Sequence, residues 1–199
     1  MNLSDTQETL IEKTIEVIAK VGLEKTTTKA ITAGTGINEA YIYRYFADKE
    51  DLLVKTFIKL DEELLEQTLQ HISVMYVQEL EYKLRCRIYF DAIWKFLLNS
   101  KEKCLAFIRY FYSPYFTKLS AEDHKKRFLP LVEKFKDAFI EEADVWMILN
   151  HILNVLLAFA VMVHNDQMSP EDDYAEHVFR VIYASVKQYF KNTEERDFV

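Results

Sequence analysis

The segment YIYRYF, residues 41–46, places three phenol groups and one guanidinium group within six positions. Both kinds of group donate hydrogen bonds to phosphates and to base edges, and neither needs a metal ion or a cofactor to do so. The segment therefore raises the possibility of nucleic-acid recognition, provided that its backbone presents these groups on one surface.

Aromatic residues at alternating positions are typical of a β-strand, but the surrounding sequence favours a helix. Residues 37–113 contain neither glycine nor proline, so a hairpin partner for such a strand would have no turn. The stretch that begins at Asp48 carries apolar residues at spacings of three and four, which is a helical period. We therefore predict a short helix at 41–46, and Asp48 as the N-cap of a long helix after it.

On a helix the six positions face different surroundings. Ile42 and Phe46 are four positions apart, so they would form a buried face together with Ile37. Tyr41 and Arg44 are three apart, and they would then project together toward the major groove of DNA.

Phosphate contacts are expected on both sides of this helix. Tyr43 and Tyr45 would flank the groove, where a phenol can donate to phosphate without adding charge. Lys49 supplies a cation near the same backbone. Thr27 and Lys29, at the start of an earlier short helix, would serve the other side together with the N-terminal amides of that helix.

The residues before this segment predict the rest of a helix-turn-helix unit. Thr27 and Asn38 are good N-cap residues, and Gly36 permits a tight turn between two short helices. Two short helices joined by such a turn and braced by a preceding helix outline this unit, whose second helix reads the groove. The predicted helices are Ser4–Val21, Thr28–Thr35 and Glu39–Phe46.

The charge balance excludes a broad basic surface. The chain has 25 basic and 32 acidic residues, a formal charge of −7. Residues 1–50 hold eight acidic and six basic residues, a local charge of −2. DNA binding would then depend on a few placed groups. Spacing alone leaves a second interpretation open, in which the tyrosines only pack and Lys49 is a solvated charge.

The same residues resemble the DNA-binding signature of the tetracycline-repressor (TetR) family of bacterial regulators. The resemblance covers roughly residues 8–55 and depends on several positions in order and spacing. Two features depart from the family pattern: Thr32 and Thr35 replace the usual small alanines, and Tyr45 stands where histidine is common. The matching positions are Thr27, Ile31, Gly36, Ile37, Tyr43, Arg44, Tyr45, Phe46, Lys49 and Leu52.

The resemblance implies a role for each matching side chain. The residues expected at phosphates are Thr27, Tyr43, Tyr45 and Lys49. The residues expected around the bases are Lys29, Asn38, Glu39, Ala40, Tyr41 and Arg44. Thr28, which follows the first of the phosphate contacts, completes the expected DNA-binding set.

Beyond Lys49 the sequence predicts only long helices, so the expected fold class is all-α. The chain has three glycines and three prolines, too few for a sheet of several strands. We expect a helix-turn-helix DNA-binding domain at 1–47 and a helical domain at 48–199, to which the resemblance assigns effector binding and dimerisation. The predicted helices are 48–72, 79–99, 102–112, 121–140, 144–165 and 171–191.

Residues 145–163 carry no formal charge over 19 positions, which is long enough for a transmembrane helix. However, Asn150, His151 and Asn154 lie in the middle, and the acidic flanks lack basic anchors. We therefore expect no membrane insertion, but a helix in a bundle whose polar stripe meets a partner or a ligand.

A homodimer is the second expectation that the resemblance implies, through the helices at 144–165 and 171–191. The last helix also has an apolar stripe too broad for a lone surface helix. A dimer would supply the second reading head that an inverted-repeat operator in double-stranded DNA requires. The stripe consists of Val178, Phe179, Ile182, Tyr183, Val186 and Phe190.

A small-molecule effector is the remaining expected partner. Aromatic residues at helical spacing usually belong to a core, whereas His151 and Asn154 are polar on an apolar helix and must find partners. Those partners could lie in a ligand, across the dimer or within the core. The ligand would be mostly apolar or aromatic with one or two polar handles. The candidate lining residues are Trp94, Phe107, Tyr110, Phe111, Met147, His151 and Asn154.

We expect no enzymatic activity, no cofactor and no metal site. The sequence contains no HExxH, GxSxG or phosphate-loop motif. Cys86 and Cys104 lack ligand spacing and read as reduced, packed thiols. His164 and Asp166 are expected in a solvated loop, and residues 123–127 on a solvated helix face.

The expected function is therefore that of a cytoplasmic transcriptional regulator, because the N-terminus does not read as a signal peptide. We expect a dimeric repressor that a mostly apolar or aromatic ligand releases from its operator. The alternatives are a DNA-binding dimer without an effector and, less favoured, a helical enzyme.

Overall fold

The computed structural model describes residues 4–169 and 172–191. Within these ranges the regular elements are all helical, and one isolated β-bridge joins Phe139 to Phe190. The prediction of an all-α fold is confirmed.

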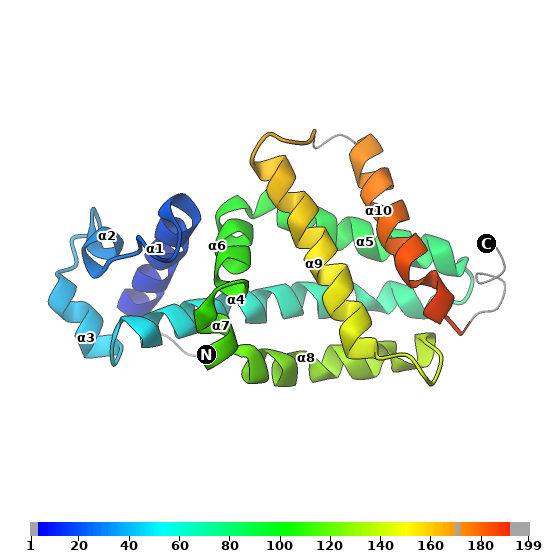
Figure 1. Ribbon diagram of the computed structural model, residues 1–199, viewed down its shortest axis with the longest axis horizontal. Coiled ribbons are helices and arrows are strands. Elements are labelled where there is room, and N and C mark those ends of the chain that lie inside the picture. Colours follow the sequence, from blue (N-terminus) through cyan, green and yellow to red (C-terminus); the bar gives the residue numbers. More distant parts are fainter. Residues whose placement is uncertain (1–3, 170–171, 192–199) are drawn as a thin grey trace. The chain divides into compact units, whose positions relative to one another are not determined.

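The helices follow one another with short connections (Figure 1). The α-helices are α1 (Asp5–Val21), α2 (Thr28–Thr32), α3 (Ile42–Tyr45), α4 (Lys49–His71), α5 (Tyr82–Asn99), α6 (Lys101–Phe111), α7 (Pro114–Leu119), α8 (Ala121–Phe135), α9 (Val145–His164) and α10 (Asp172–Val186). The 3-10 helices are η1 (Glu39–Tyr41), η2 (Ile72–Tyr76), η3 (Lys136–Ala138) and η4 (Lys187–Tyr189).

These helices form two compact units, and α4 and α8 each contribute to both. Unit 1 comprises residues 1–64 and 100–126, and unit 2 comprises residues 65–99 and 127–199. The predicted boundary between residues 47 and 48 is a division by function rather than by compactness, and it stays a prediction.

The core of unit 1 includes the contact between α1 and α6. Ile11, Ile15 and Ile18 are buried on the inner face of α1, as their three-and-four spacing predicts. Arg109 on α6 donates hydrogen bonds of 2.7 and 2.9 Å to the carbonyls of Ile18 and Ala19. The last carbonyls of a helix lack partners within it, so this guanidinium both caps α1 and fixes its end against α6.

An aromatic cluster fills unit 1 between α4, α6 and α7. Phe57 stacks on Tyr110 with the ring centroids 4.6 Å apart, and its ring lies 5.2 Å from Phe107 and 5.4 Å from Phe116. The Tyr110 hydroxyl is hydrogen-bonded to Ser120 at 2.9 Å, which satisfies the one polar atom that this ring buries. Aromatic packing of this kind makes the cluster a core rather than an open site.

A buried polar pair lies beside this cluster. His124 on α8 donates from Nδ1 to the carboxylate of Asp61 on α4 at 2.8 Å, and their side chains are 2% and 0% exposed. The prediction that residues 123–127 form a solvated helix face is therefore wrong at His124, although Asp123, Lys125 and Lys126 are exposed. A charged run in a sequence does not reveal that one member has a carboxylate partner on a distant helix.

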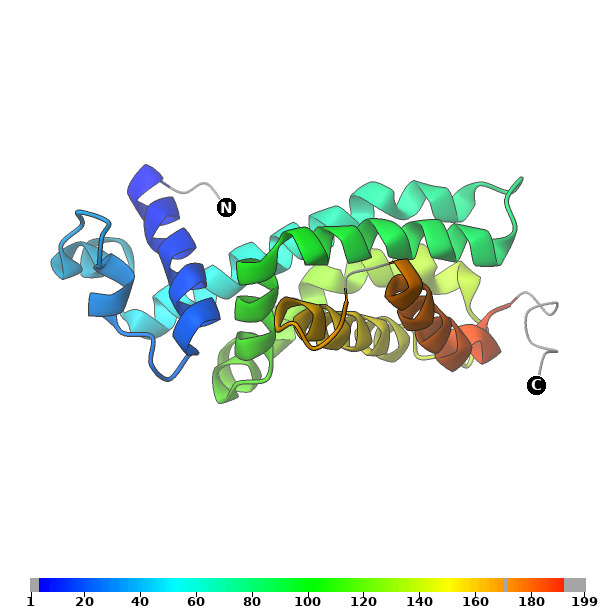
Figure 2. The same cartoon turned by 90° about the horizontal axis from the view of Figure 1, so that it is seen from above.

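The core of unit 2 is built from α5, α9 and α10, which pack on one another. Figures 1 and 2 show α9 and α10 side by side, in gold and orange. His164 at the end of α9 is buried, and its Nε2 donates to the Leu97 carbonyl on α5 at 2.9 Å. The expectation that His164 belongs to a solvated loop is therefore wrong, whereas Asp166 is exposed.

The helix α7 lies between two predicted helices, where no helix was expected. Ser113 caps this helix by accepting a hydrogen bond from the Phe116 amide, and Pro114 occupies its first turn, where its missing N–H costs nothing. Some predicted helices also prove shorter: the one at 121–140 ends as α8 at Phe135, and the one at 171–191 ends as α10 at Val186, with residue 171 outside the described ranges.

Cys104 is a packed thiol, as the sequence predicts. It is 3% exposed on α6, and burial raises the pKa of its thiol to about 12. Since the thiolate is the reactive form, Cys104 is an inert core residue near neutral pH.

We predict that Asp61→Ala lowers the free energy of unfolding by about 3 kcal/mol, because it leaves His124 buried without its carboxylate partner. Urea denaturation followed by circular dichroism measures this change. Asp123→Ala is the matched control, because Asp123 is adjacent to the same histidine but its side chain is 68% exposed. Equal effects of the two substitutions would contradict the importance of the buried pair.

Candidate functional site

The first short helix of the candidate site, α2, is fixed by a cap and one buried side chain. The Thr27 hydroxyl accepts a hydrogen bond of 3.1 Å from the Ala30 amide, as predicted. Ile31 is fully buried beneath the helix. Thr27 and Lys29 are exposed and Thr28 is half-buried, so the start of α2 faces solvent.

The helix α2 is shorter than predicted, so the connection after it is longer. The α-helix ends at Thr32 rather than at Thr35, and Gly34 and Gly36 follow with φ of +76° and +71°. Such positive φ values disfavour side chains, which explains the glycines. The Thr35 hydroxyl donates to the Thr32 carbonyl at 2.8 Å and accepts from the Ile37 amide at 3.0 Å. Thr35, which stands where the TetR family usually has an alanine, therefore stabilises the turn through its hydroxyl group.

The YIYRYF segment is helical, as predicted. Asn38 caps it by accepting a hydrogen bond of 3.0 Å from the Ala40 amide, and it begins as the 3-10 helix η1 before it continues as α3. Ile42 is fully buried, Phe46 is 2% exposed and Ile37 is half-buried. These three apolar residues form the predicted inner face.

The burial of this inner face turns the polar groups outward. Tyr41 is 45% exposed and Tyr43 is 60% exposed. The Arg44 guanidinium is exposed and lies 5.9 Å from the ring centroids of both Tyr41 and Tyr45. Tyr41 and Arg44 therefore share one surface, and Tyr45 is half-buried beside it.

One hydrogen bond links the two short helices at this surface. The Thr28 hydroxyl donates to the Glu39 carboxylate at 2.7 Å. The bond holds the only acidic side chain of the predicted DNA-binding set in one orientation. That set contains three cations, Lys29, Arg44 and Lys49, so its net charge is +2 although residues 1–50 together carry −2.

The start of α4 has the predicted cap with one difference. Asp48 accepts a hydrogen bond from the Asp51 amide at 2.8 Å. The Asp51 carboxylate in turn accepts one of 2.9 Å from the Ala47 amide, whereas a standard capping box would use the amide of Asp48 itself. Burial opposes the ionised form of Asp51, yet the bonds from Lys55 and Ala47 hold its pKa below the usual value. Lys49, in the first turn of α4, is half-buried.

Unit 2 contains a separate cavity of about 100 Å³. Aromatic and aliphatic side chains from α5, α9 and α10 line it, together with Cys86 of α5 and residues near η2, η3 and η4. Its lining is almost entirely apolar, so it suits a hydrocarbon group rather than a charged one.

The seven residues that the sequence nominated as ligand contacts do not line this cavity. Phe107 and Tyr110 belong to the aromatic cluster of unit 1, and Phe111 lies beside it with its ring 4.4 Å from Phe116. Trp94 is 5% exposed and stacks on Phe90.

The three nominated residues on α9 lie on its outer face. Met147 is 54% exposed and His151 is exposed, with its Nε2 hydrogen-bonded to the Ser185 hydroxyl at 3.0 Å. Asn154 donates to the backbone and side-chain oxygens of Asn150. The polar groups of His151 and Asn154 thus have hydrogen-bond partners on α9 and α10, and neither residue lines the cavity.

The cavity instead uses the apolar stripe that the sequence assigned to a dimer interface. Phe179, Ile182, Tyr183 and Val186 of α10 line it, and so does Phe190. This stripe is buried within one chain, so it is not itself the surface for a partner. The apolar period of a helix indicates that one face is buried. It does not indicate whether the same chain or a partner chain buries that face.

No group of metal-binding side chains occurs in the described part of the chain. Within the same ranges, α9 is the one helix long and apolar enough to cross a membrane by length and composition, and 28% of its most apolar window is buried. Most of the remaining residues of α9 are half-buried, and the exposed ones include Met147 and His151.

Comparison with known proteins identifies the region that carries the polar surface. Residues 10–56 match the family of bacterial regulatory proteins, tetR family. The comparison with curated proteins found no match. The region matched includes α1, α2, η1, α3 and the first turns of α4.

Solved structures share the fold over most of the chain at low sequence identity. A TetR family transcription regulator from Marinobacter aquaeolei VT8 aligns with a TM-score of 0.73 and 16% identity, over 90% of this chain and 94% of that chain. The fatty acid degradation regulator FadR from Bacillus halodurans gives 0.72 and 17%, over 94% and 99%. FadR from Bacillus subtilis, solved in complex with stearoyl-CoA, gives 0.66 and 18%, over 88% and 96%.

We predict that Ile42→Ala destabilises the protein strongly, whereas Tyr43→Ala, at the adjacent position, hardly changes its stability. The first should lower the free energy of unfolding by about 3 kcal/mol because it opens a cavity beneath α3. The second should change it by less than about 0.5 kcal/mol because Tyr43 is exposed. Denaturant titration of both variants checks the orientation of this segment, and a larger loss with Tyr43→Ala would refute it.

Proposed function

We propose that this chain, whose residues 10–56 match the tetR family of bacterial regulatory proteins, is a dimeric, sequence-specific repressor that an apolar ligand releases from DNA. One observation carries the proposal: burial of Ile42 and Phe46 presents Tyr41, Tyr43 and Arg44 together on an exposed helical surface. A surface of this size and polarity fits the edges of base pairs in a major groove.

The roles within this surface follow from charge and reach. Tyr41 and Arg44 would contact base edges, because they project from the exposed face of the reading segment. Tyr43, Lys49 and the Thr27 hydroxyl would contact phosphates on either side. The phosphate contacts are few, so the proposal depends on their placement rather than on the charge of the chain.

A second copy of the chain is proposed to cover the outer faces of α9 and α10. Met147, Met162, Tyr174 and Val181 on these faces are between 37% and 54% exposed. Apolar side chains that gather on neighbouring helices are typical of a surface that another molecule covers. A two-fold dimer through these helices would provide two reading heads for an inverted repeat.

The cavity of unit 2 is the proposed effector site. Its apolar lining supports a ligand with a hydrocarbon group, and the similar fold of FadR from Bacillus subtilis in complex with stearoyl-CoA supports the same choice. Ligand binding would favour a conformation of the dimer whose reading heads no longer match the operator.

A cytoplasmic DNA-binding dimer without an effector is the second candidate. The small size of the cavity favours it, because about 100 Å³ cannot hold a long chain without rearrangement. A ligand that binds the folded protein raises its melting temperature, so thermal scans against apolar compounds separate the two candidates.

We predict that selection of genomic fragments by the purified protein recovers an inverted repeat. Lys49→Ala should weaken binding to it and lower the slope of log affinity against log salt by about one, because it removes one phosphate contact. Lys20→Ala is the control, since Lys20 is an exposed lysine of unit 1 outside the proposed interface. The proposal fails if no sequence is enriched at either a low or a high salt concentration.

We predict that Val181→Asp converts a dimer into a monomer, because a carboxylate at the centre of an apolar interface loses its hydration. Light scattering coupled to size-exclusion chromatography measures the mass. Leu129→Asp is the control, since Leu129 is 47% exposed on α8, outside these two helices. A wild-type monomer, or an unchanged dimer in the Val181 variant, would refute the interface.

A further inference from the structure

We propose that Arg87 is the head-group site of the unit 2 cavity, where the negative charge of an acyl amphiphile replaces Glu176 and so releases α10 from α5. This inference rests on the proposed effector site and adds the charge of the ligand and the contact that the ligand breaks. The shared chemistry is a linear acyl chain that ends in an anion, either a carboxylate or the phosphates of a coenzyme A thioester.

The cavity itself explains why the ligand must move a helix. Its volume is about 100 Å³, which is far less than a long acyl chain occupies. Its walls include Phe90 of α5, Ile152 of α9 and Phe179 of α10. A chain that enters between these walls must widen the distance between them, so any bond that joins α5 to α10 resists its entry.

Arg87 forms such a bond next to two side chains that line the cavity. Its guanidinium lies 5.8 Å from the ring centroid of Phe90 on α5 and 5.4 Å from that of Phe179 on α10. Both rings line the cavity. The Nη1 atom of Arg87 pairs with the carboxylate of Glu176 on α10. The guanidinium thus lies against two rings of the chamber lining without lining the chamber itself, and this is where we place the charged end of an amphiphile.

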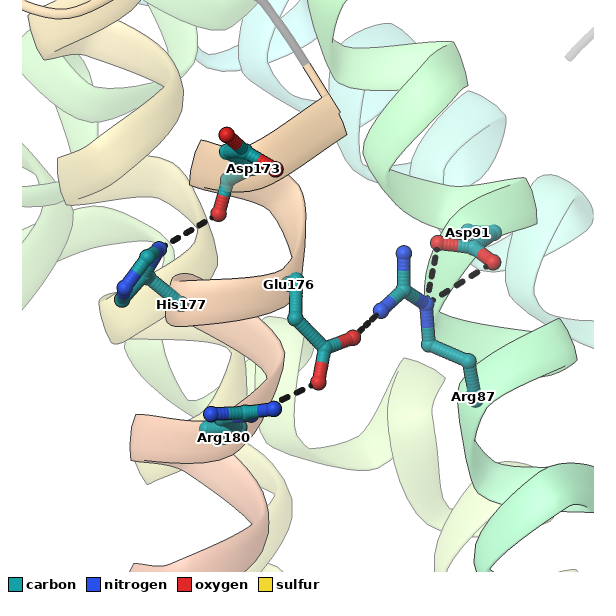
Figure 3. A network of polar contacts seen from close by, with 6 residues as sticks. All are labelled: Arg87, Asp91, Asp173, Glu176, His177 and Arg180. Carbon is teal, nitrogen blue, oxygen red and sulfur yellow. Dashed lines mark hydrogen bonds and ion pairs between the residues drawn. The ribbon is translucent and has the colours of Figure 1, made fainter.

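The neighbouring groups make this pair exchangeable (Figure 3). Asp91 accepts two bonds from Arg87 Nε, at 2.8 and 2.9 Å, so it orients the guanidinium whether or not Glu176 is present. Glu176 also accepts a bond of 2.7 Å from Arg180, one turn along α10. When a ligand anion takes the place of Glu176 at Arg87, Glu176 therefore keeps a cationic partner, and no charge is left unpaired.

A second cation favours an anion over a neutral head group. Lys83 lies one turn before Arg87 on α5, and its Nζ is 5.7 Å from the ring centroid of Tyr183, which also lines the cavity. Lys83 is exposed and has no acidic partner in the described part of the chain. Lys83 therefore adds a cation to the carboxylate-paired Arg87 one turn away on α5, and a ligand with a hydrocarbon chain and an anionic end would complement both.

Isothermal titration calorimetry of the full chain with three probes tests the charge. Decanoate, 1-decanol and decyltrimethylammonium share a decyl chain and differ in the charge of the head group. We expect decanoate to bind at least about tenfold more tightly than decanol, as a charge-assisted hydrogen bond to Arg87 predicts, and the cation to bind least. Decanoyl-coenzyme A in a parallel titration distinguishes the thioester from the free acid as the source of the anion.

Matched variants test the assignment to Arg87. Arg87→Gln should weaken decanoate binding about tenfold and leave decanol binding unchanged, whereas Glu176→Gln should strengthen decanoate binding, because Arg87 loses its resident anion. Arg180→Gln is the control: Arg180 binds the same glutamate, but its side chain is 70% exposed and no described ring contact joins it to the cavity. Its effect on decanoate should stay within about twofold.

Several results would overturn the inference. Decanoate and decanol could bind with equal affinity, or no probe could bind at all. The Arg87 and Arg180 variants could lose equal affinity for decanoate, or only Arg85→Gln, which removes a cation two positions away on α5, could lose it. The titrations need no DNA, so they separate this inference from the proposed function. A protein that binds decanoate through Arg87 but selects no operator refutes the repressor and leaves the head-group site.

Discussion

The exposed recognition surface depends on the burial of two side chains, Ile42 and Phe46. A helix of this length has too few internal hydrogen bonds to be stable alone, so tertiary contacts must fix it. Because Ile42 and Phe46 are four positions apart, their burial sets the rotation of the segment about its axis. The outward direction of Tyr41, Tyr43 and Arg44 follows from that rotation. The glycine turn and the caps at Thr27 and Asn38 deliver the segment to this position.

Polar contacts inside unit 1 support the same surface. Arg109 closes the end of α1, and the Asp61–His124 pair joins α4 to α8 beneath the aromatic cluster. Buried polar groups are costly when unpaired, so contacts of this kind favour one arrangement of the helices over nearby alternatives. An acidic chain can therefore present three cations, Lys29, Arg44 and Lys49, on α2, α3 and α4, where the proposed function places DNA.

Unit 2 combines an apolar chamber with charged contacts at its edge. The ring of Phe179 belongs to the chamber and also lies against Arg87, so the hydrocarbon and ionic parts of the site meet at one side chain. The same helix, α10, carries Val181 and Tyr174 on its outer face, where a second chain is proposed to bind. A change at the inner face of α10 would thus be transmitted to the dimer through one rigid element, and no longer pathway is required.

The sequence by itself determined the recognition unit, because its signals are local. N-cap residues, glycines at positive φ and apolar residues at helical spacing all act within a few positions, and the exposed and buried residues of 41–46 are as predicted. Tertiary structure decided the rest. The carboxylate partner of His124 is 63 positions away, and the cavity gathers residues from several helices that are distant in the sequence. The apolar stripe from Phe179 to Phe190 is an example. Its helical period indicates a buried face, but only the packing of the helices decides whether the same chain or a partner covers that face.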